Sequence, residues 1–378
     1  ALPRGAVVGC LGGGQLGRMA ALAAVPMGVP VAFLDPAGDK CSAAVAAAFV
    51  QEGSFRDAEE IKRFAERVDV LTVEIEHVDC DAIEAACEAT GVQCHPSPAA
   101  IRVIQDKCAQ KEHFAAAGVP LPAFRAVGDI GELEEAAREL GLPLMLKAKR
   151  LAYDGRGNAV AKTSEDLASA AASLGGFEAG LYVEQWAPFV AELAVMVARG
   201  AGGETVCYPV VETKHRDSIL DIVEAPAAVP LRVREKALAA AEAAVQALPG
   251  DVRGVFGVEL FLMPDGAVLL NEVAPRPHNS GHYTIEACDC SQFENHVRAV
   301  LGWPLGDGAM RVGGSVMYNL IGEREDAAEG AEVAHAALGG ALATAGVSAH
   351  WYDKGEVRKA RKSGHLTSVG RTMPEARA

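Results

Sequence analysis

Short apolar runs alternate with amphipathic stretches over the first hundred residues. The apolar runs Ala6–Leu11, Val29–Asp35 and Val70–Glu76 predict strands. Apolar positions at helical spacing between and after these runs predict the helices Gln15–Ala24, Asp57–Arg67 and Cys80–Thr90. Strands that alternate with helices are typical of a parallel α/β sheet. We therefore predict a first α/β domain over residues 1–105, which ends close behind His95-Pro96-Ser97-Pro98.

The pattern changes after a predicted helix at Asp106–Ala117, which Gly118-Val119-Pro120 ends. Short strands now dominate: Leu144–Lys147, Asn158–Ala161, Tyr182–Gln185, Ala191–Ala198 and Thr205–Val211. Helices with capping residues near their starts are expected at Gly131–Leu140 and Ser164–Leu174, and further helices at Arg232–Ala247, packed between strands, and within Gly322–Ala345. This α+β pattern predicts a linker and lid domain over residues 106–187 and a larger sheet domain over residues 188–378.

Composition and charge restrict the class of protein. The 378 residues carry a net charge of −15, which argues against binding to nucleic acids or to anionic membranes. Nine cysteines without a CxxC pair favour free thiols in a reducing compartment, and no apolar run has the length of a membrane span. No signal or transit peptide is visible at Ala1-Leu2-Pro3-Arg4, so we expect a cytoplasmic protein; an organelle is the alternative if a transit peptide has been removed.

The segment Gly254–His282 carries the strongest chemical pattern. It predicts two apolar strands joined by a Pro264-Asp265-Gly266 turn, which brings Glu259 close to the Asn271-Glu272 pair. Carboxylates on a hydrophobic hairpin are costly unless a cation lies between them, and such oxygen ligands suit Mg²⁺ with substrate phosphates. The donor-rich loop Arg276–His282 follows directly, which indicates a reaction centre for a nucleotide.

A glycine-rich turn follows the first predicted strand. Gly12, Gly14 and Gly17 have the spacing of the dinucleotide fingerprint, and Asp35 ends the next strand. The backbone amides at the start of such a helix can bind any phosphate. The motif leaves three interpretations open: an NAD site, a site for the phosphate of another ligand, and a tight turn without a ligand.

Two further segments favour a nucleotide when they are combined with the hairpin. Lys147 ends a buried strand, and the loop Tyr153–Asn158 follows it with two glycines, an aromatic ring and a cation. Such a loop can close over phosphates, although an exposed turn is the alternative. The strand end Glu184–Ala187 can offer backbone groups to an adenine, with Glu184 or Glu192 accepting from a ribose; a core Trp186 at a strand end is the alternative.

Basic residues gather near the end of this acidic chain: Lys354, Arg358, Lys359, Arg361, Lys362 and His365. They predict either a site for an anionic substrate or a solvated face. His278 and His282 have a four-residue interval that could suit zinc. The Asn279-Ser280-Gly281 segment between them is poor helix sequence, which disfavours zinc.

Taken together, these motifs resemble the ATP-grasp superfamily and, within it, the N5-carboxyaminoimidazole ribonucleotide synthetase family. The segments that carry the resemblance are Gly12–Met19, Gln105–Lys107, Gln110-Lys111, Tyr153–Gly157, Glu184-Gln185, Asn271–His282 and Trp351–Lys354. The resemblance covers nearly the whole chain. It implies an α/β and α+β ATP-grasp fold with a Rossmann-like N-terminal domain, a lid domain and a C-terminal sheet domain.

The resemblance also implies a reaction of purine biosynthesis. ATP, bicarbonate and 5-aminoimidazole ribonucleotide would give N5-carboxyaminoimidazole ribonucleotide, ADP and phosphate by way of carboxyphosphate. Mg²⁺ would be the metal ion, with Mn²⁺ as the alternative. The expected assembly is a homodimer, and the chain would be either monofunctional or one domain of a fusion with a mutase or carboxylase domain.

Site residues follow from the same match. ATP would be bound by Lys107, Lys147, Tyr153, Asp154, Gly155, Arg156, Gly157, Asn158, Glu184, Gln185, Trp186, Ala187, Glu192, His215, Asn271 and Glu272. The ribonucleotide would be bound by Gln15, Leu16, Glu76, Tyr153, Arg156, Lys354 and Arg361. Glu259 and Glu272 would hold the metal ion, and the catalytic residues would be Arg276, His278, Asn279 and Lys354.

The chain departs from the family pattern at several positions. Leu151-Ala152 stands where glycines are usual, and Lys107 stands where bacterial relatives often have arginine. An extra Gly355 and the pair Lys359-Ala360 leave the roles of Arg358 and Lys359 open. Three alternatives stay open for function: a related ligase such as a formate-dependent glycinamide ribonucleotide transformylase, an NAD-dependent oxidoreductase, and a catalytically silent ATP-binding sensor.

Overall fold

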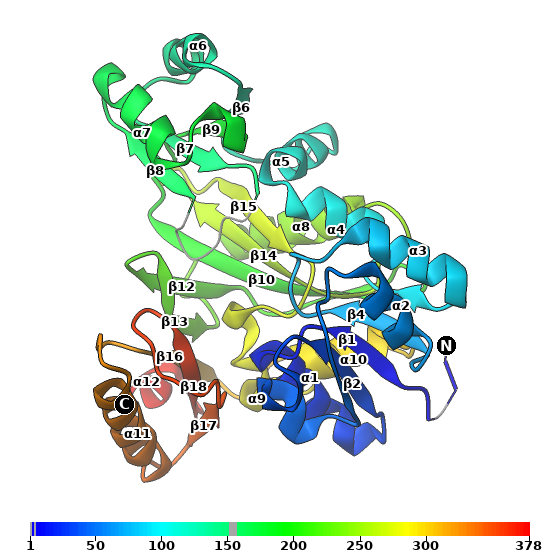
Figure 1. Ribbon diagram of the computed structural model, residues 1–378. Coiled ribbons are helices and arrows are strands. Elements are labelled where there is room, and N and C mark those ends of the chain that lie inside the picture. The colour runs from blue at the N-terminus through cyan, green and yellow to red at the C-terminus, as the bar shows by residue number, and fades with distance from the viewer. Residues whose placement is uncertain (1, 4, 151–156) are drawn as a thin grey trace.

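The computed structural model describes residues 2–3, 5–150 and 157–378, which build three β-sheets (Figure 1). The first sheet is wholly parallel, in the order β3-β2-β1-β4-β5. Its strands are β1 Val8–Leu11, β2 Val31–Asp35, β3 Val50–Glu52, β4 Val70–Val73 and β5 Gln93–Cys94. Helices α1 Gln15–Ala24, α2 Ala58–Ala65 and α3 Cys80–Thr90 pack around it. The predicted parallel α/β domain is confirmed, but β4 is shorter than expected, so Glu74 and Glu76 lie beyond the strand.

Two helices, α4 Pro98–Gln105 and α5 Lys107–Ala116, lead to the second sheet. This sheet is antiparallel, in the order β6-β9-β7-β8. Its strands are β6 Phe124–Val127, β7 Leu144–Ala148, β8 Asn158–Ala161 and β9 Leu181–Gln185. Helices α6 Ile130–Leu140 and α7 Leu167–Ser173 bury its apolar side chains. Asp129 caps α6 and Thr163 lies in a capping box before α7, as the capping pattern predicted.

The third sheet has nine strands and is antiparallel, in the order β15-β14-β10-β12-β13-β16-β18-β17, with β11 paired to β10. Its strands are β10 Ala191–Arg199, β11 Thr205–Cys207, β12 Val211–Arg216, β13 Ile219–Ala225, β14 Gly254–Leu262, β15 Val268–Ala274, β16 Gly314–Ile321, β17 Val347–Trp351 and β18 Lys362–Gly370. Its helices are α8 Leu231–Ala247, α9 Thr284–Ala287, α10 Gln292–Val300, α11 Ala327–Leu342 and α12 Met373–Arg377.

The three sheets meet around the β10–β14–β15 part of the largest one (Figure 1). Helix α8 shares a large apolar core with these strands, built from residues such as Val245, Phe256 and Leu270. Helix α10 packs against α1 on one side and against β10 and β14 on the other, so it joins the first sheet to the third. Among the described residues, no helix has both the length and the apolar character needed to cross a bilayer.

Two details of the predicted elements are wrong. Thr205–Val211 is not one strand: β11 ends at Cys207 and β12 begins at Val211, because Pro209 has no N–H to offer a ladder. Helix α8 packs on a face of the largest sheet and not between strands. The domain boundaries after residues 105 and 187 fall between the three sheets, and they stay predictions.

Candidate active site

A cavity of about 1270 Å³ opens where the three sheets meet. Residues of the first α/β domain beyond its strands and residues of the second and third sheets and their loops line it: Gly14, Gln15, Leu16, Glu74, Glu76, Lys107, Lys147, Asn158, Tyr182, Glu184, Gln185, Trp186, Ala187, Phe189, Glu192, His215, Ser218, Glu259, Phe261, Asn271, Glu272, Arg276, His278, Asn279, Lys354, Arg358, Lys359, Arg361 and Lys362. The structure therefore brings together nearly every site residue predicted from sequence. Of the described ones, only Gly157 is not at the cavity wall; its carbonyl accepts from the amide of Ala148 at 2.8 Å.

The predicted hairpin places its two carboxylates directly opposite each other. Glu259 on β14 pairs in register with Glu272 on β15, and a bulge follows, because Leu260 pairs with Leu270 and leaves Asn271 as the extra residue. The turn has the expected chemistry, with Gly266 at φ +77° and the Asp265 carboxylate accepting from the amide of Ala267 at 2.9 Å. The predicted proximity of Glu259 and Glu272 is confirmed.

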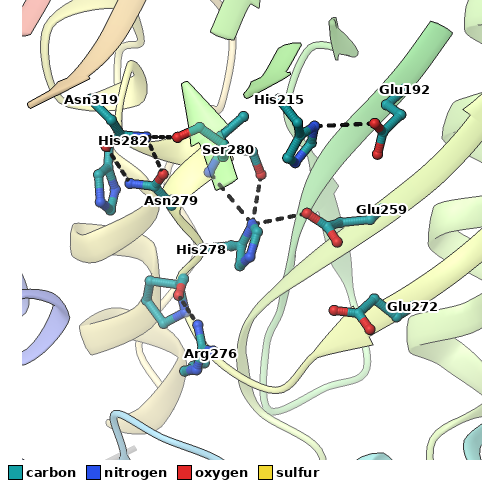
Figure 2. A network of polar contacts seen from close by, with 12 residues as sticks. Glu192, His215, Glu259, Glu272, Arg276, His278, Asn279, Ser280, His282 and Asn319 are labelled. Carbon is teal, nitrogen blue, oxygen red and sulfur yellow. Dashed lines mark hydrogen bonds and ion pairs between the residues drawn. The ribbon is translucent and has the colours of Figure 1, made fainter. Parts of the chain in front are cut away.

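The electrostatics of the two carboxylates differ. Burial, together with the charge of Glu272, raises the pKa of Glu259 to about 7. Burial alone would also raise the pKa of Glu272, but the Lys107 ammonium, 2.8 Å from Glu272 Oε2, outweighs it and lowers that pKa. Both carboxylates point toward the loop that carries Arg276 and His278 (Figure 2). A cation near Glu259 would relieve the repulsion between the pair.

The donor set at this point fits Mg²⁺. Glu259, Glu272 and Asn271 all line the cavity, and each has a side-chain oxygen atom. Within the described part of the chain, no cluster of three or more His, Cys, Asp or Glu side chains could hold a metal ion by itself. One or two carboxylates with phosphate oxygens completing the shell is the arrangement that Mg²⁺ prefers in nucleotide sites.

A buried group of two lysines and one glutamate lies beside the carboxylate pair. Glu184 on β9 is 3.1 Å from Lys147 Nζ through one oxygen and 3.1 Å from Lys111 Nζ through the other. Burial lowers the pKa of Lys111 to about 8, although the charge of Glu184 raises it and so opposes part of this shift. Lys111 was not predicted as a site residue; its position one helical turn after Lys107 was the available signal.

Aromatic side chains and a His–Glu pair form the wall near the strand end Glu184–Ala187. Phe189 and Phe261 stack with ring centroids 4.7 Å apart, and neither was predicted from sequence because their pairing depends on the approach of two strands. His215 Nδ1 lies 3.2 Å from Glu192 Oε1. Burial opposes charge on His215, but this carboxylate outweighs it and raises the pKa of the imidazole.

An ion pair joins the first sheet to the loop after β15. Arg276 Nε lies 2.7 Å from Glu76 Oε2, and Arg276 Nη2 lies 3.3 Å from Glu76 Oε1. Burial would raise the pKa of Glu76, but Arg276 and Lys107 together lower it to about 2. The predicted substrate residue Glu76 and the predicted catalytic residue Arg276 are therefore direct partners.

The loop beyond Arg276 turns its polar side chains toward one another (Figure 2). His278 Nδ1 is 2.8 Å from Ser280 Oγ and 3.8 Å from Glu259 Oε1. Burial and the charge of Arg276 lower the pKa of His278 to about 3, so its ring is neutral at pH 7. The side-chain amides of Asn279 and Asn319 form two hydrogen bonds with each other: Asn279 Nδ2 donates to Asn319 Oδ1 at 3.0 Å, and Asn319 Nδ2 donates to Asn279 Oδ1 at 2.5 Å.

The predicted basic cluster divides into two parts. Lys354, Arg358, Lys359, Arg361 and Lys362 line the cavity. His365 instead is fully buried, where its Nδ1 lies 2.7 Å from the hydroxyl of Tyr352. Arg361 Nη1 donates to the carbonyl of Lys354 at 3.4 Å, so two of the predicted substrate residues are held together.

The glycine-rich turn binds a carboxylate of the protein itself. Glu74 accepts from the amides of Gly14 at 2.6 Å, Leu16 at 2.8 Å and Gly17 at 3.3 Å. Asp35 accepts from the amide of Gly13 at 2.8 Å. The amides that would bind a pyrophosphate in a dinucleotide site are already bonded, and this disfavours the NAD reading. Gln15 and Leu16 nonetheless line the cavity.

Four predicted residues, Tyr153, Asp154, Gly155 and Arg156, lie outside the described residues, as do Leu151 and Ala152. The strands on either side of them are in place: Asn158, at the start of β8, pairs with Lys147 on β7, and both line the cavity.

Three family models match consecutive parts of the chain. A ribonucleotide synthetase preATP-grasp domain matches residues 6–105, an ATP-grasp domain matches residues 112–293, and a phosphoribosylaminoimidazole carboxylase C-terminal domain matches residues 315–378. The first match contains the whole first sheet, the second contains the second sheet and strands β10 to β15 of the third, and the last covers the part of the third sheet from β16 to β18.

Whole-chain comparisons agree. A chloroplastic phosphoribosylaminoimidazole carboxylase of Vigna aconitifolia is 50% identical over 369 residues; these cover 97% of this chain but only 64% of that protein. An N5-carboxyaminoimidazole ribonucleotide synthase of Pseudomonas aeruginosa is 38% identical over 95% of this chain and 93% of that protein. The carboxyaminoimidazole ribonucleotide synthase of Aspergillus clavatus, solved with ATP, superposes with a TM-score of 0.90 and 41% identity over 99% of this chain and 96% of that one. The chain therefore belongs to the N5-carboxyaminoimidazole ribonucleotide synthase family of ATP-grasp proteins.

Proposed function

We propose that the protein carboxylates 5-aminoimidazole ribonucleotide on its exocyclic amine, with ATP and bicarbonate as co-substrates and ADP and phosphate as further products. The observation that carries the proposal is the union, in one cavity, of the Glu259–Glu272 pair with the Arg276–His278 loop. The Aspergillus clavatus synthase, which is 40% identical, has been solved with ADP and 5-aminoimidazole ribonucleotide, and this likeness supports the same ligands here.

For ATP, the proposed site runs from the strand end Glu184–Ala187 to the carboxylate pair. The stacked Phe189 and Phe261 would cover the base, and Glu192 or Glu184 would accept from the ribose. Lys107 and Lys147 would bind phosphate oxygens. Because Glu184 lies between Lys147 and Lys111, that group of three keeps a net positive charge beside the phosphates.

Glu259 and Glu272, helped by the oxygen of Asn271, would hold Mg²⁺, with Mn²⁺ as the alternative. The ion supplies charge neutralisation for the phosphates when it is bound. Lys107 then has two tasks, because its ammonium lies 2.8 Å from Glu272 and also faces the cavity. It keeps Glu272 ionised and ready to bind a cation.

Carboxylation would follow in two steps. A bicarbonate oxygen attacks the γ-phosphorus of ATP and ADP leaves, which forms carboxyphosphate. The amine nitrogen of the ribonucleotide then forms a bond to the carboxyl carbon, phosphate leaves, and the nitrogen gives up a proton. Arg276 would bind the bicarbonate anion beside Glu76. His278 would accept the proton that the amine loses once a bound anion offsets the charge of Arg276, which lowers the pKa of the imidazole in the free protein.

The ribonucleotide itself would be held between the first and third sheets. Gln15, Leu16 and Glu76 face it from one side, and Lys354 and Arg361 face it from the other. A phosphate monoester carries close to two negative charges at pH 7, and the basic wall complements that charge. Tyr153 and Arg156 stay candidates for the same ligand.

We expect a homodimer, which sedimentation at several protein concentrations would test. The cytoplasm is the expected location, and the chloroplastic relative supports an organelle as the alternative. The chain spans 64% of that relative's length, and we propose that it acts either alone or in one polypeptide with a mutase or carboxylase domain.

The decisive experiment is phosphate release with substrates omitted one at a time. The proposal requires phosphate release and a carboxylated nucleotide only when ATP, Mg²⁺, bicarbonate and 5-aminoimidazole ribonucleotide are all present. Turnover with formate and glycinamide ribonucleotide would favour a transformylase instead. Oxidation of NADH with candidate ketones would favour an oxidoreductase, and ATP binding without any turnover would favour a sensor.

A further inference from the structure

The chain between the metal carboxylate and His278 is held at both ends by buried glutamines. Strand β15 lies at the edge of the largest sheet, so beyond β14 it has no second strand partner among the described residues. At Val273, the residue after Glu272, the missing partner is replaced by a side chain from α5. Gln110 Oε1 accepts from the amide of Val273 at 2.9 Å, and Gln110 Nε2 donates to its carbonyl at 3.2 Å.

The same arrangement recurs at the other end. Gln292 on α10 accepts from the amide of His278 through Oε1 at 3.0 Å and donates to its carbonyl through Nε2 at 2.8 Å. Both glutamines are buried, with 1% of Gln110 and 0% of Gln292 exposed. Gly281 leaves the room that Gln292 needs, since a Cβ there would come within 2.4 Å of Gln292 Oε1.

The chemistry of these contacts is specific to an amide. A carboxamide offers a donor and an acceptor side by side, as a neighbouring strand does, whereas a carboxylate only accepts and a thioether does neither usefully. Leaving a buried N–H and C=O unpaired is costly, so each glutamine holds one residue of the backbone in place. Neither glutamine lines the cavity, and both therefore act through the backbone.

We propose that Gln110 and Gln292 are positioning residues that set the spacing between the metal carboxylate Glu272 and the proton acceptor His278. The roles of those two residues rest on the proposed function, but the clamp itself does not. Loss of Gln292 should misplace His278, which acts in the carboxylation step, and should leave phosphoryl transfer from ATP intact. Loss of Gln110 should misplace Glu272, which acts in the earlier binding of the metal ion and ATP.

A matched control lies one turn further along α10. Asn295 is also fully buried and also clamps one backbone residue: its Oδ1 accepts from the amide of Gly306 at 2.7 Å, and its Nδ2 donates to that carbonyl at 3.0 Å. Gly306 is away from the cavity. Asn295→Leu therefore removes the same kind of contact, at the same burial, together with a hydrogen bond from Nδ2 to the Tyr208 hydroxyl at 2.8 Å, without touching the Glu272–His278 segment.

The experiment compares Gln292→Met with Asn295→Leu, with Gln292→Glu as a second variant in case the methionine protein does not fold. We expect Gln292→Met to lose about tenfold or more in the rate of nucleotide carboxylation relative to the control, because two hydrogen bonds are worth about that factor. Phosphate released per nucleotide carboxylated should rise above the wild-type ratio, while KM for ATP stays within about twofold. A wild-type ratio and no greater loss than in the control would overturn the proposal.

Gln110→Met is read out by metal binding and not by turnover. Titration of Mn²⁺ in the presence of ADP should show an affinity about tenfold weaker than in wild type or Asn295→Leu. Amide hydrogen exchange should also quicken at Val273 in this variant and at His278 in Gln292→Met. Unchanged exchange at both amides would refute the clamp, whereas absence of carboxylation by the wild type would refute only the proposed function.

Discussion

Arg276 and Glu76 lie 200 positions apart in the sequence and meet through two contacts, at 2.7 and 3.3 Å. The pair connects the end of β4 in the first sheet to the loop that follows β15 in the third. Gln105 strengthens the connection, because its Nε2 donates to the carbonyl of Glu76 at 2.6 Å. The position of a predicted catalytic side chain therefore depends on a domain that contributes no metal carboxylate.

Replacing Glu76 tests this connection. Glu76→Gln should lower the free energy of unfolding by about 3 kcal/mol at pH 7, because the buried Arg276 guanidinium loses its charge partner. The folded pKa of about 2 lies below the unfolded value of 4.5, so the ionised form stabilises the fold above pH 4.5. That stability is lost as the pH falls toward 2. Urea unfolding of both proteins should show their difference shrinking over this range; a constant difference would contradict it.

The Glu259–Glu272 pair should lower the stability of the metal-free protein, although turnover requires it. Ionised Glu259 destabilises the metal-free protein as the pH rises from 4.5 through about 7, because its folded pKa is raised. Glu259→Gln should therefore raise the metal-free unfolding free energy by about 1–3 kcal/mol above pH 7. The same change should weaken Mn²⁺ binding and turnover. Glu272→Gln should abolish turnover in a folded protein, and retained activity in that variant would remove the metal assignment.

Buried His296 should make the fold sensitive to acid. Burial lowers its pKa to about 4, while its Nδ1 accepts from the amide of Val255 at 3.1 Å and its Nε2 lies 2.9 Å from Thr72 Oγ1. The unfolded state binds the proton first, so stability should fall as the pH drops from 6.5 toward 4, by about 1.4 kcal/mol per unit from this group.

His296→Gln keeps a donor and an acceptor but does not titrate. Chemical unfolding at several pH values between these limits should give a shallower dependence for the variant than for wild type. Equal slopes in the two proteins would show that His296 is not the group responsible. Other buried imidazoles, such as His278, contribute to both slopes and cancel in the comparison.

Gly257 should be irreplaceable because of its contact with His278. A Cβ at this position of β14 would lie 2.3 Å from the Cβ of His278. Gly257→Ala should cost about 1–3 kcal/mol of stability by overpacking and should slow carboxylation more than it weakens ATP binding. Gly340→Ala in α11 is the control: its Cβ would meet nothing within 4 Å, and it should stabilise the helix by about 1 kcal/mol. Equal effects of both changes on carboxylation would contradict the argument.

Lys111 should influence ATP without touching it. In Lys111→Met, Glu184 would keep Lys147 as its one charge partner, so the group would lose its net positive charge. The affinity for ATP should therefore fall about tenfold. The unfolding free energy should fall by about 3 kcal/mol, because Glu184 Oε1 loses its buried charge partner. Calorimetric titration of ATP tests this, with the exposed Lys236→Met as the control. Unchanged affinity would leave Lys111 a purely structural role.

The parts of the site that depend on neighbouring residues could be predicted from the sequence. The hairpin turn at Pro264–Gly266 is local, so the closeness of Glu259 to the Asn271-Glu272 pair could be predicted, whereas the exact register and the bulge at Asn271 could not. The strand–helix alternation of the first domain is also local, and its helices were found within a few residues. The Arg276–His282 loop was predicted as part of the reaction centre because it follows the second strand directly.

Contacts made across long sequence distances could not be predicted in this way. No local pattern predicted the contacts of Gln110 and Gln292, because these contacts exist only where two helices pass beside the β15 segment. Strands β16 and β18 were not predicted either. They bury polar residues such as Asn319, His365 and Thr367, which disguises the alternation expected of a half-buried strand.

The glycine-rich turn has a consequence for how such motifs should be used. Its donors are saturated by Glu74, a side chain about sixty positions further along the chain. The ligand of the motif is thus an internal anion, supplied permanently and at no cost in binding entropy. Removing that one carboxylate would expose three amides at the positive end of α1 and create an anion site from an unchanged motif. What a glycine loop recognises can be decided by a residue outside it, and divergence at that single position could convert a structural joint into a cofactor site.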